Sequence, residues 1–383
     1  MHFDLSDEQK AIRDTLSAFL AARFGAAEGV DAVKATSLDR TLWRELGDLG
    51  LNAILVPERA GGLGLGLLTL AVVSEVCGAY AVPAPVVPNA LGAWLLAEAG
   101  TEAQRAEWLE RLLAGEAIAA FALGEASGWL PEHWTLGEDP GERRKLYVER
   151  ADEADLLIVG LSGGGLGLVR RDDPGVVISP LDSLDRTRPL SDVAVEVAAI
   201  EPIAATPQIV EKLVDALLVT LAADGLGAAL AAQARAVGYA KERKQFGRLI
   251  GSFQALKHQL ADLSVELEPA RPFYWYAAHG WDTDRDDARR MASIVKAHIG
   301  EISVNAARAV IEAHGGIGYT WEYPAHLLLK RAMFDRTAMG TPVFHRDRAA
   351  ALAGWSQGHE RAEDALAAAG GPADAQRLAA GAD

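Results

Sequence analysis

The composition of the sequence and the spacing of its apolar residues change twice along the chain, and these two changes constrain the fold more than any other feature. Residues 1–117 and the residues from 207 onward carry apolar side chains at helical spacing, whereas residues 118–206 are rich in Gly, Pro and Asp and contain short β-branched runs. A segment of strands enclosed by two segments of helices predicts an α+β fold, mostly α, in three parts. We expect an N-terminal helical domain (1–117), a middle antiparallel β-domain (118–206), a C-terminal helical bundle (207–360) and an Ala/Gly-rich tail (361–383).

Capping boxes mark two helix starts in the first part. Ser6 and Thr101 are each followed three residues later by a glutamine, Gln9 and Gln104, whose side chain can return a hydrogen bond to the cap. The cap hydroxyl can accept from the third backbone N–H, so each pair satisfies donors that a helix start otherwise leaves free. We therefore expect helices to begin directly after Ser6 and Thr101.

Short strands and long helices fill the rest of the chain. We expect strands at 146–148, 156–159, 175–178 and 193–197, and helices at 209–242, 254–267, 286–313 and 325–337. Glycines between two of these strands, at 163–165 and 167, resemble a phosphate-binding loop. They match no nucleotide-binding fingerprint and precede no helix start, so we interpret them as a hairpin turn.

Charge and cysteine content exclude several classes of function. The 383 residues include 37 basic and 53 acidic ones, a net charge of −16, whereas a nucleic-acid-binding protein needs a basic surface for phosphates. Cys77 is the single cysteine, so no intramolecular disulfide and no cysteine-based metal cluster can form, and we expect no metal. The acidic N-terminus lacks the apolar core of a signal peptide, and apolar runs such as 216–223 are shorter than the ~20 residues of a membrane span. These features favour a cytoplasmic protein.

One candidate ligand-binding segment, Glu242–Gly247, lies at the end of the longest expected helix. Arg243 offers a planar fork of donors that suits a pyrophosphate, Phe246 offers a flat apolar face, and Gly247 allows the chain to turn. An alternative stays open, because Arg243 and Lys244 can simply stabilise the negative end of the helix dipole.

A second candidate segment, His314–Pro324, stands between two expected helices. Its paired glycines, Gly315 and Gly316, allow the backbone to approach a ligand or a neighbouring helix closely. The alternative here is a helix C-cap followed by an ordinary loop.

At this spacing, and after a β-domain, the two segments resemble the acyl-CoA dehydrogenase family. The resemblance covers nearly the whole chain, since Leu5–Gln9, Val56–Gly64, Tyr239–Gln254 and His314–Pro324 all fit. It implies the fold of that family, with a C-terminal four-helix bundle, and its cofactor, FAD. It also implies the family reaction: a glutamate removes the α-proton of an acyl-CoA, the flavin takes the β-hydride to leave a 2,3-enoyl-CoA, and an electron-transfer flavoprotein accepts the electrons.

The resemblance further implies that each FAD site is shared between subunits. One subunit holds the flavin ring, and its neighbour contacts the pyrophosphate and adenine end. By that resemblance Arg243, Gln245, Phe246, Gly315 and Gly316 contact the FAD of an adjacent subunit.

Both positions that the family uses for the catalytic glutamate are apolar in this sequence. The usual position, before a Gly-Thr pair, is Met339, and the position used by some other members is Leu217. Neither side chain can accept a proton, so we name no catalytic residue. The nearest acids, Glu211 and Asp215, are out of helical register. We interpret them as part of a solvated helix face, and Asp215 as a displaced base remains an alternative.

The β-domain also lacks the family's signature for the flavin ring. Gly124–Pro131 lacks the expected Gly-Ser-Asp, and Tyr147–Arg150 stands in place of the expected Trp-Ile-Thr-Asn. Glu149 thereby puts a carboxylate where a hydroxyl is expected, and like-charge repulsion disfavours a reduced, anionic flavin beside it. In the glycine loop, Glu312 stands in place of an expected glutamine.

The residues expected to contact a neighbour's FAD are thus present, whereas the motifs that would hold the chain's own flavin ring are missing. We hypothesise that the chain is the degenerate subunit of an α2β2 acyl-CoA dehydrogenase for a bulky acyl-CoA, of the kind associated with actinobacterial steroid side-chain degradation. A homologous partner subunit would carry the base. Three alternatives stay open: a self-sufficient homotetramer, a flavin monooxygenase on the same fold, and a scaffold without turnover. We interpret His345, which stands beside Arg346, as a surface or interface residue.

Overall fold

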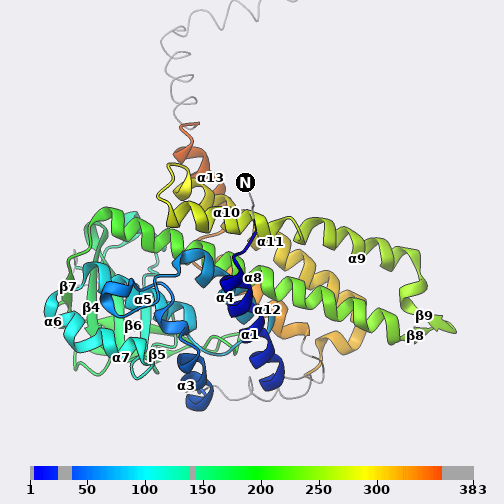
Figure 1. Cartoon of the computed structure of the whole chain (residues 1–383), viewed down its shortest axis with the longest axis horizontal. Helices are drawn as coiled ribbons and strands as arrows, with labels where there is room; N and C mark the ends of the chain where they lie inside the picture. Colours follow the sequence, from blue (N-terminus) through cyan, green and yellow to red (C-terminus); the bar gives the residue numbers. More distant parts are fainter. Residues whose placement is uncertain (1–3, 25–36, 138–143, 322, 324, 356–383) are drawn as a thin grey trace, which may run out of the picture.

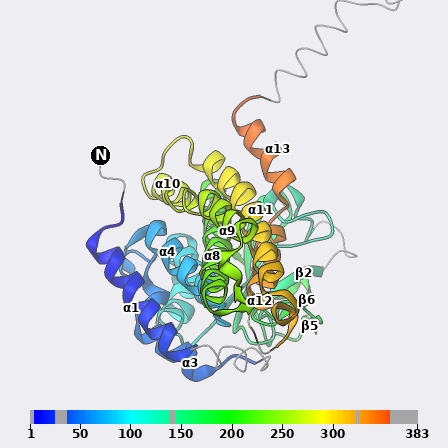
Figure 2. The ribbon, with the colours of Figure 1, turned by 90° about the vertical axis from the view of Figure 1, so that its right-hand side faces the viewer.

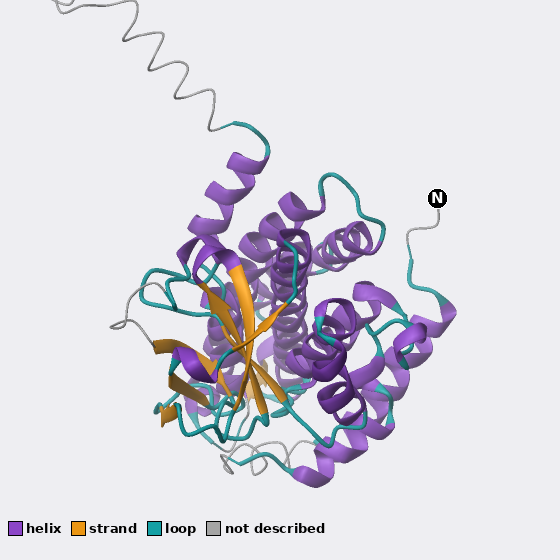
Figure 3. Ribbon diagram, turned by 90° about the vertical axis from the view of Figure 1, so that its left-hand side faces the viewer, coloured by secondary structure: helices purple, strands orange, loops and turns teal. Residues whose placement is uncertain are grey.

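The computed structural model describes residues 4–24, 37–137, 144–321, 323 and 325–355, and its elements follow the expected order of helices, strands and helices (Figure 1). The expected α+β fold, mostly α, is confirmed. The strands gather beside the N-terminal helices, and the long C-terminal helices run behind both (Figure 3). The predicted tail, 361–383, lies outside the described residues.

The N-terminal part is helical, and both capping boxes are present. Gln9 N donates to Ser6 Oγ over 3.1 Å and Gln104 N donates to Thr101 Oγ1 over 3.2 Å, while both glutamine side chains accept from the cap N–H. The helices are α1 (Asp7–Arg23), α3 (Arg40–Asp48), α4 (Gly66–Ala79), α5 (Val86–Ala99), α6 (Glu102–Gln104) and α7 (Glu110–Leu113), with a π-helical turn at Arg105–Leu109 between the last two. Helix α5 was not predicted, because Pro88 reads as a breaker although the first helical turn tolerates proline.

Two small sheets form the β-domain. One has the strand order β1 (Ala119–Ala122), β3 (Leu156–Leu161), β4 (Gly165–Arg170) and β7 (Glu201–Ile203), and the other has the order β2 (Arg144–Glu149), β6 (Leu190–Val195) and β5 (Val176–Pro180). The expected hairpin turn at Gly163–Gly165 is confirmed, because it joins the antiparallel strands β3 and β4.

The expectation of a purely antiparallel β-domain needs one correction. Strands β1 and β3 pair in parallel, with Ala119 opposite Leu156. The chain passes through β2 in the other sheet between them, and this crossover gives it the length that a parallel connection requires.

The C-terminal part is a set of long helices packed around α8 (Figure 2). The elements are α8 (Pro207–Glu242), β8 (Lys244–Gln245), β9 (Arg248–Leu249), α9 (Gln254–Leu267), α10 (Ala270–Asp282), α11 (Ala288–His314), η8 (Gly315–Tyr319), α12 (Ala325–Thr337) and α13 (Pro342–Leu352). All four expected helices are present. Helices α10 and α13 were missed, because Pro269 and Pro342 read as the ends of helices, whereas they lie at helix starts, where proline is tolerated.

Helix α8 forms the core of the C-terminal part. By length and composition alone it is apolar enough to cross a membrane, which the count of consecutive apolar residues did not indicate. However, 89% of its most apolar stretch is buried inside the protein, against α4, α11 and α12. It is therefore a core helix of the fold, apolar on all sides because protein surrounds it.

Candidate functional site

A cavity of about 100 Å³ lies where the three parts of the fold meet. Its walls include Ala84 from the loop between α4 and α5, Phe121 and Tyr147 from the β-domain, and Leu221 from α8. Most of the lining is apolar, and charged side chains form one wall. A concave apolar site with a few polar groups is the usual form of a ligand site, so this cavity is the candidate for the chain's own catalytic site.

Both sequence positions considered for a catalytic glutamate lie in the wall of this cavity. Leu217 comes from α8, and Met339 comes from the loop after α12. They are 8% and 5% exposed. The fold brings the two positions to one site, and both carry side chains that cannot accept a proton.

Two buried side chains hold the backbone around Met339. Met339 has φ +59° and Gly340 has φ +116°, in a region that non-glycine residues rarely adopt. His345 Nε2 lies 2.9 Å from Met339 O, and Lys296 Nζ donates to Gly340 O over 3.3 Å and to Arg336 O over 3.1 Å. His345 and Lys296 therefore hold the loop that carries Met339, although this loop presents no base to the cavity.

The interpretation of His345 as a surface or interface residue was wrong, because its side chain is fully buried. Burial, with the nearby charge of Lys296, lowers the pKa of His345 to about 3. A neutral imidazole can donate from Nε2 to Met339 O, so His345 supports the loop. Within the described residues, no cluster of His, Cys, Asp and Glu side chains has the arrangement of a metal site.

Neither of the two acids near Leu217 on α8 belongs to the lining of the cavity. Asp215 is buried rather than solvated, which corrects the sequence interpretation, and burial raises its pKa to about 6. Arg348 Nη2 donates to Asp215 Oδ1 over 3.3 Å. Glu211 is more exposed and pairs with Arg289 over 2.9 Å. Of the two acids, therefore, only Glu211 belongs to a solvated helix face.

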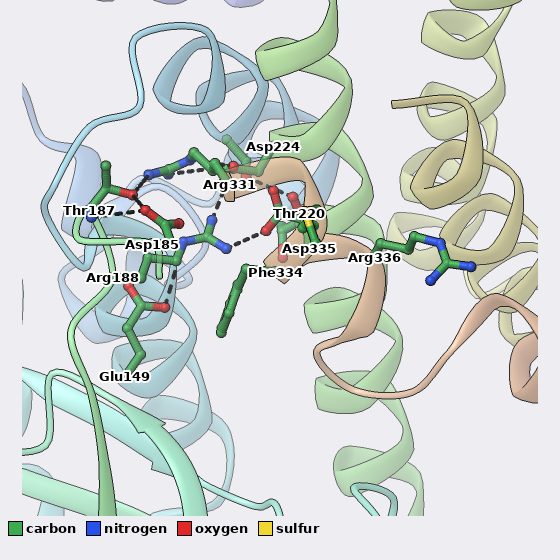
Figure 4. Close-up of polar contacts among 12 residues, drawn as sticks. Glu149, Asp185, Thr187, Arg188, Thr220, Asp224, Arg331, Phe334, Asp335 and Arg336 are labelled. Atoms are coloured by element: carbon green, nitrogen blue, oxygen red, sulfur yellow. Dashed lines mark hydrogen bonds and ion pairs between the residues drawn. The ribbon is translucent and has the colours of Figure 1, made fainter. Parts of the chain in front are cut away.

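A buried network of charged side chains forms the polar wall of the cavity (Figure 4). Arg331 on α12 donates from Nε and Nη2 to the two oxygens of Asp224 on α8, over 2.6 and 2.7 Å, and from Nη1 to Thr187 Oγ1 over 3.0 Å. Arg188, from the loop before β6, forms ion pairs with Asp335 of α12 and, over 3.1 Å, with Asp224. None of the four charged residues is more than 6% exposed.

The two acids of this network have opposite pKa shifts. Burial alone would raise the pKa of Asp224, but Arg331 and Arg188 outweigh it and hold the pKa below its ordinary value. Burial raises the pKa of Asp335 well above its ordinary value, against its ion pair with Arg188 and with the help of the charge on Asp224. Although Asp224 lines the cavity, both its oxygens are occupied and its pKa is low, so it is a poor base.

The network was missed by the sequence reasoning. Asp224 follows Leu217 by seven residues, about two helical turns, so both lie on one face of α8, and this spacing was the available signal. Arg188 gave no signal, because its loop meets α8 and α12 only through the tertiary fold.

Glu149, the acid expected at the flavin-ring position, lines the cavity. Its Oε2 lies 3.9 Å from Nε of Arg188. Beside it Tyr147 stacks on Trp129, with the ring centroids 6.1 Å apart, and both rings line the cavity. This wall therefore presents a carboxylate, a guanidinium and two aromatic rings.

A buried ion pair anchors the loop that carries Trp129. Glu125 accepts from Thr135 N over 2.8 Å and from Leu136 N over 3.3 Å, and it pairs with the fully buried Lys145 of β2. Burial lowers the pKa of Lys145. Burial alone would raise the pKa of Glu125, but its hydrogen bonds to Lys145 and Thr135 outweigh this effect and lower the pKa. The pair ties the loop to β2 and fixes Trp129 at the cavity.

The first predicted ligand segment lies at the tip of the bundle, away from the cavity, where β8 and β9 form a hairpin (Figure 1). Arg243 and Gln245 are exposed there, and Gln245 Nε2 donates to Lys244 O over 2.8 Å. Phe246 has φ +53° and is 92% exposed, which no packing within the described chain explains. An exposed aromatic side chain beside an arginine is typical of a surface that contacts a ligand or a partner.

The glycine loop lies at the same end of the bundle. Tyr239 of α8 stacks on His314 of α11 with centroids 4.6 Å apart, and His314 directly precedes Gly315. Gly315 caps α11 with φ +62°, so the C-cap interpretation also holds for it. A Cβ added at Gly315 or Gly316 would meet nothing within 4 Å, so packing within the described chain leaves room for a ligand against both.

Comparisons with known proteins identify the class. The acyl-CoA dehydrogenase N-terminal domain matches residues 6–116, and the acyl-CoA dehydrogenase C-terminal domain matches residues 213–353. The acyl-CoA dehydrogenase IpdE2 of Mycobacterium tuberculosis is 35% identical over 341 residues, 88% of this chain and 94% of that protein. The chain therefore belongs to the acyl-CoA dehydrogenase family, as the sequence resemblance indicated.

Two further relatives cover almost the whole chain. The probable acyl-CoA dehydrogenase YngJ of Bacillus subtilis is 31% identical over 378 residues, 90% of this chain and 98% of that protein. A solved variant of the Tcur3481–Tcur3483 steroid ACAD is similar with a TM-score of 0.81 at 28% identity, over 92% of this chain and 99% of that chain.

FAD is the cofactor of this family, so family membership confirms the cofactor expected from the sequence. The two candidate sites differ in how well they fit it. The cavity, at about 100 Å³, is smaller than the roughly 300–1,000 Å³ of typical ligand pockets, and it presents Glu149, so its residues do not fit a flavin ring. The tip of the bundle presents exposed donors and open glycines, which fit the phosphate and adenine portion.

Proposed function

We propose that this chain is the non-catalytic subunit of a heteromeric acyl-CoA dehydrogenase and completes the FAD site of a homologous partner subunit. One observation carries the proposal: both family positions for the base, Leu217 and Met339, lie in one cavity and are apolar. The nearby acids do not replace them, because Asp224 is clamped by two arginines and Asp215 pairs with Arg348. The partner would then supply the base for α-proton removal.

The exposed tip of the bundle supports a role toward a neighbour's cofactor. Arg243 can donate to phosphate oxygens, Phe246 offers its ring to an apolar or aromatic surface, and the backbone at Gly315 and Gly316 is open to close approach. When bound, FAD supplies the hydride acceptor of the reaction. The part of this chain is to hold and orient the non-reacting end of that cofactor.

The substrate class rests on similarity. The Tcur3481–Tcur3483 steroid ACAD, 28% identical to this chain, supports a bulky acyl-CoA such as one with a steroid side chain. An α2β2 assembly in the cytoplasm, with an electron-transfer flavoprotein as acceptor, completes the proposal.

The alternatives have less support. A self-sufficient dehydrogenase would need Asp215 or another acid as a displaced base. The Asp215 side chain lies outside the cavity lining, where it pairs with Arg348. A scaffold without turnover would not need exposed arginine and aromatic side chains next to open glycines. A monooxygenase would need a flavin in the chain's own cavity, whose residues do not fit the ring.

Arg243→Ala tests the proposal in the complex with a homologous acyl-CoA dehydrogenase as partner subunit. Loss of a charged hydrogen bond to phosphate, worth about 1.5–3 kcal/mol, should weaken FAD binding by the complex about tenfold or more. Lys244→Ala is the matched control, because it removes the same charge from the next exposed residue. Equal FAD affinity of the two variants would mean that Arg243 is only a helix-end charge.

A further inference from the structure

The cavity lies in the crevice between the β-domain and the helical bundle, and one side chain crosses that crevice. Arg188 belongs to the β-domain, in the loop between β5 and β6, yet its guanidinium lies among side chains of α8 and α12 (Figure 4). It forms ion pairs with Asp335 and Asp224 of the bundle, and its Nε lies 3.9 Å from Glu149 of β2. The guanidinium also lies over the ring of Phe334, 4.9 Å from its centroid. Both walls of the crevice are therefore tied to the same cation.

The loop that carries Arg188 is itself fixed on both sides. Thr187 N and Oγ1 donate to Asp185 Oδ1 over 2.9 and 2.7 Å, and Thr187 Oγ1 accepts from Arg331 of α12. Arg150 Nη2, at the end of β2, donates to Thr187 O over 3.3 Å and to Pro83 O over 2.7 Å. The loop thus connects the β-domain to α12 and, through Pro83, to the loop between α4 and α5.

We propose that Arg188 is a latch that holds the β-domain against the bundle and keeps this chain's own cavity closed to a flavin ring. The inference rests on the proposed function only in taking this cavity as the chain's own flavin site. Desolvated ion pairs resist separation, because a crevice that opens must take Arg188 away from Asp335 and Asp224, and Asp335 then loses its ion-pair partner in a buried place. Glu149 adds a third carboxylate to the same cation from the β-domain side. The latch explains why a chain of an FAD family encloses a cavity of only about 100 Å³ at this position.

Arg188→Met in the full chain tests the latch. The substitution keeps the apolar stem and removes the charge, while Arg331 continues to neutralise Asp224 through two bonds and Asp335 can take up a proton. Hydrogen–deuterium exchange of residues 144–149, 190–195 and 331–337 should become about tenfold faster or more, since one partner of a buried pair is lost. Added free FAD, followed by its fluorescence and by its retention after dialysis, should bind the variant more tightly than the wild-type chain.

Arg186→Met is the matched control, because Arg186 is exposed two residues earlier in the same loop and lies over the Trp321 ring. It should leave both exchange and FAD binding at wild-type values. Arg188→Lys, which keeps the charge and loses the planar fork, should give a smaller change in the same direction and serves if the methionine variant does not fold.

Three outcomes decide the matter. Faster exchange together with tighter FAD binding supports the latch. Exchange equal to that of the Arg186→Met control overturns it, and faster exchange without any gain in FAD binding overturns the exclusion of the flavin by Arg188. None of these readouts involves a partner's cofactor, so they are separate from the Arg243→Ala test of the proposed function.

Discussion

Lys296 should make the stability of this protein rise with pH, in the direction opposite to that of a lysine paired with an acid. Its side chain is fully buried behind the Met339 loop, and its Nζ donates to two backbone oxygens, those of Arg336 and Gly340. Burial lowers the pKa of Lys296 to about 7. The ammonium form is therefore disfavoured in the folded chain, although the carbonyl groups at the end of α12 partly stabilise it.

The direction of the pH dependence follows from proton linkage. The same side chain titrates near 10.4 in an unfolded chain, so between about pH 7 and pH 10 the unfolded state binds the extra proton. The free energy of unfolding must then rise with pH in this window. The cost of burying the charge is fully present below about pH 7 and is relieved as the pH rises. With about 1.36 kcal/mol per pKa unit, the gain between pH 7 and pH 9 is about 2–3 kcal/mol.

Urea unfolding of the full chain at pH 6.5, 7, 8 and 9 measures this gain, and Lys296→Met provides the reference. The variant has no titrating group at this position, so the difference between wild type and variant should increase by about 2–3 kcal/mol from pH 7 to pH 9. Lys257→Met, on the exposed side of α9, should show a constant difference over the same range. A wild-type minus Lys296→Met difference that stays flat would refute the account of Lys296 as a buried amine.

Two further substitutions test the buried ion pairs. Arg331→Met should lower the free energy of unfolding, measured in urea, by about 3–5 kcal/mol, because it leaves Asp224 buried with Arg188 alone. The control is Arg336→Met, which should cost less than about 1 kcal/mol because the Arg336 side chain turns away from the network in Figure 4. Similar costs for the two variants would contradict the role of Arg331 in holding Asp224. Glu125→Gln should lower the free energy of unfolding by about 3–5 kcal/mol, because Lys145 loses its ion-pair partner in a fully buried position. Hydrogen–deuterium exchange of residues 125–136 should also become faster. Unchanged exchange of these residues would show that the loop does not depend on the ion pair of Glu125 with Lys145.

Local signals in the sequence predicted much of the fold. The capping boxes at Ser6 and Thr101 gave two helix starts correctly, because a cap depends on residues within one turn. The segments 254–267 and 325–337 gave α9 and α12 with their bounds. The missed helices α5, α10 and α13 each have a proline before or within their first turn, where periodicity and propensity give opposite signals.

The candidate site could be predicted only in part. The motifs located Met339 and Leu217, and the structure brings both to one cavity. The predictions for Asp215 and His345 were wrong, because a polar side chain is usually exposed. The sequence does not show that Asp215 has a buried partner in Arg348, or that His345 has one in the backbone carbonyl of Met339. The network of Arg188, Asp224, Arg331 and Asp335 could not be predicted, because it joins residues far apart in the chain whose proximity depends on how the β-domain packs on the bundle.

The central claim, that this chain contributes to a flavin enzyme without being one alone, is tested most directly by its flavin content and activity with and without a partner. The full chain would be purified alone and together with a homologous acyl-CoA dehydrogenase as partner subunit, and bound FAD and acyl-CoA dehydrogenation would be measured for each. The account predicts no tightly bound FAD and no dehydrogenation for the chain alone, and both for the complex. Tightly bound FAD and turnover by the chain alone would contradict it.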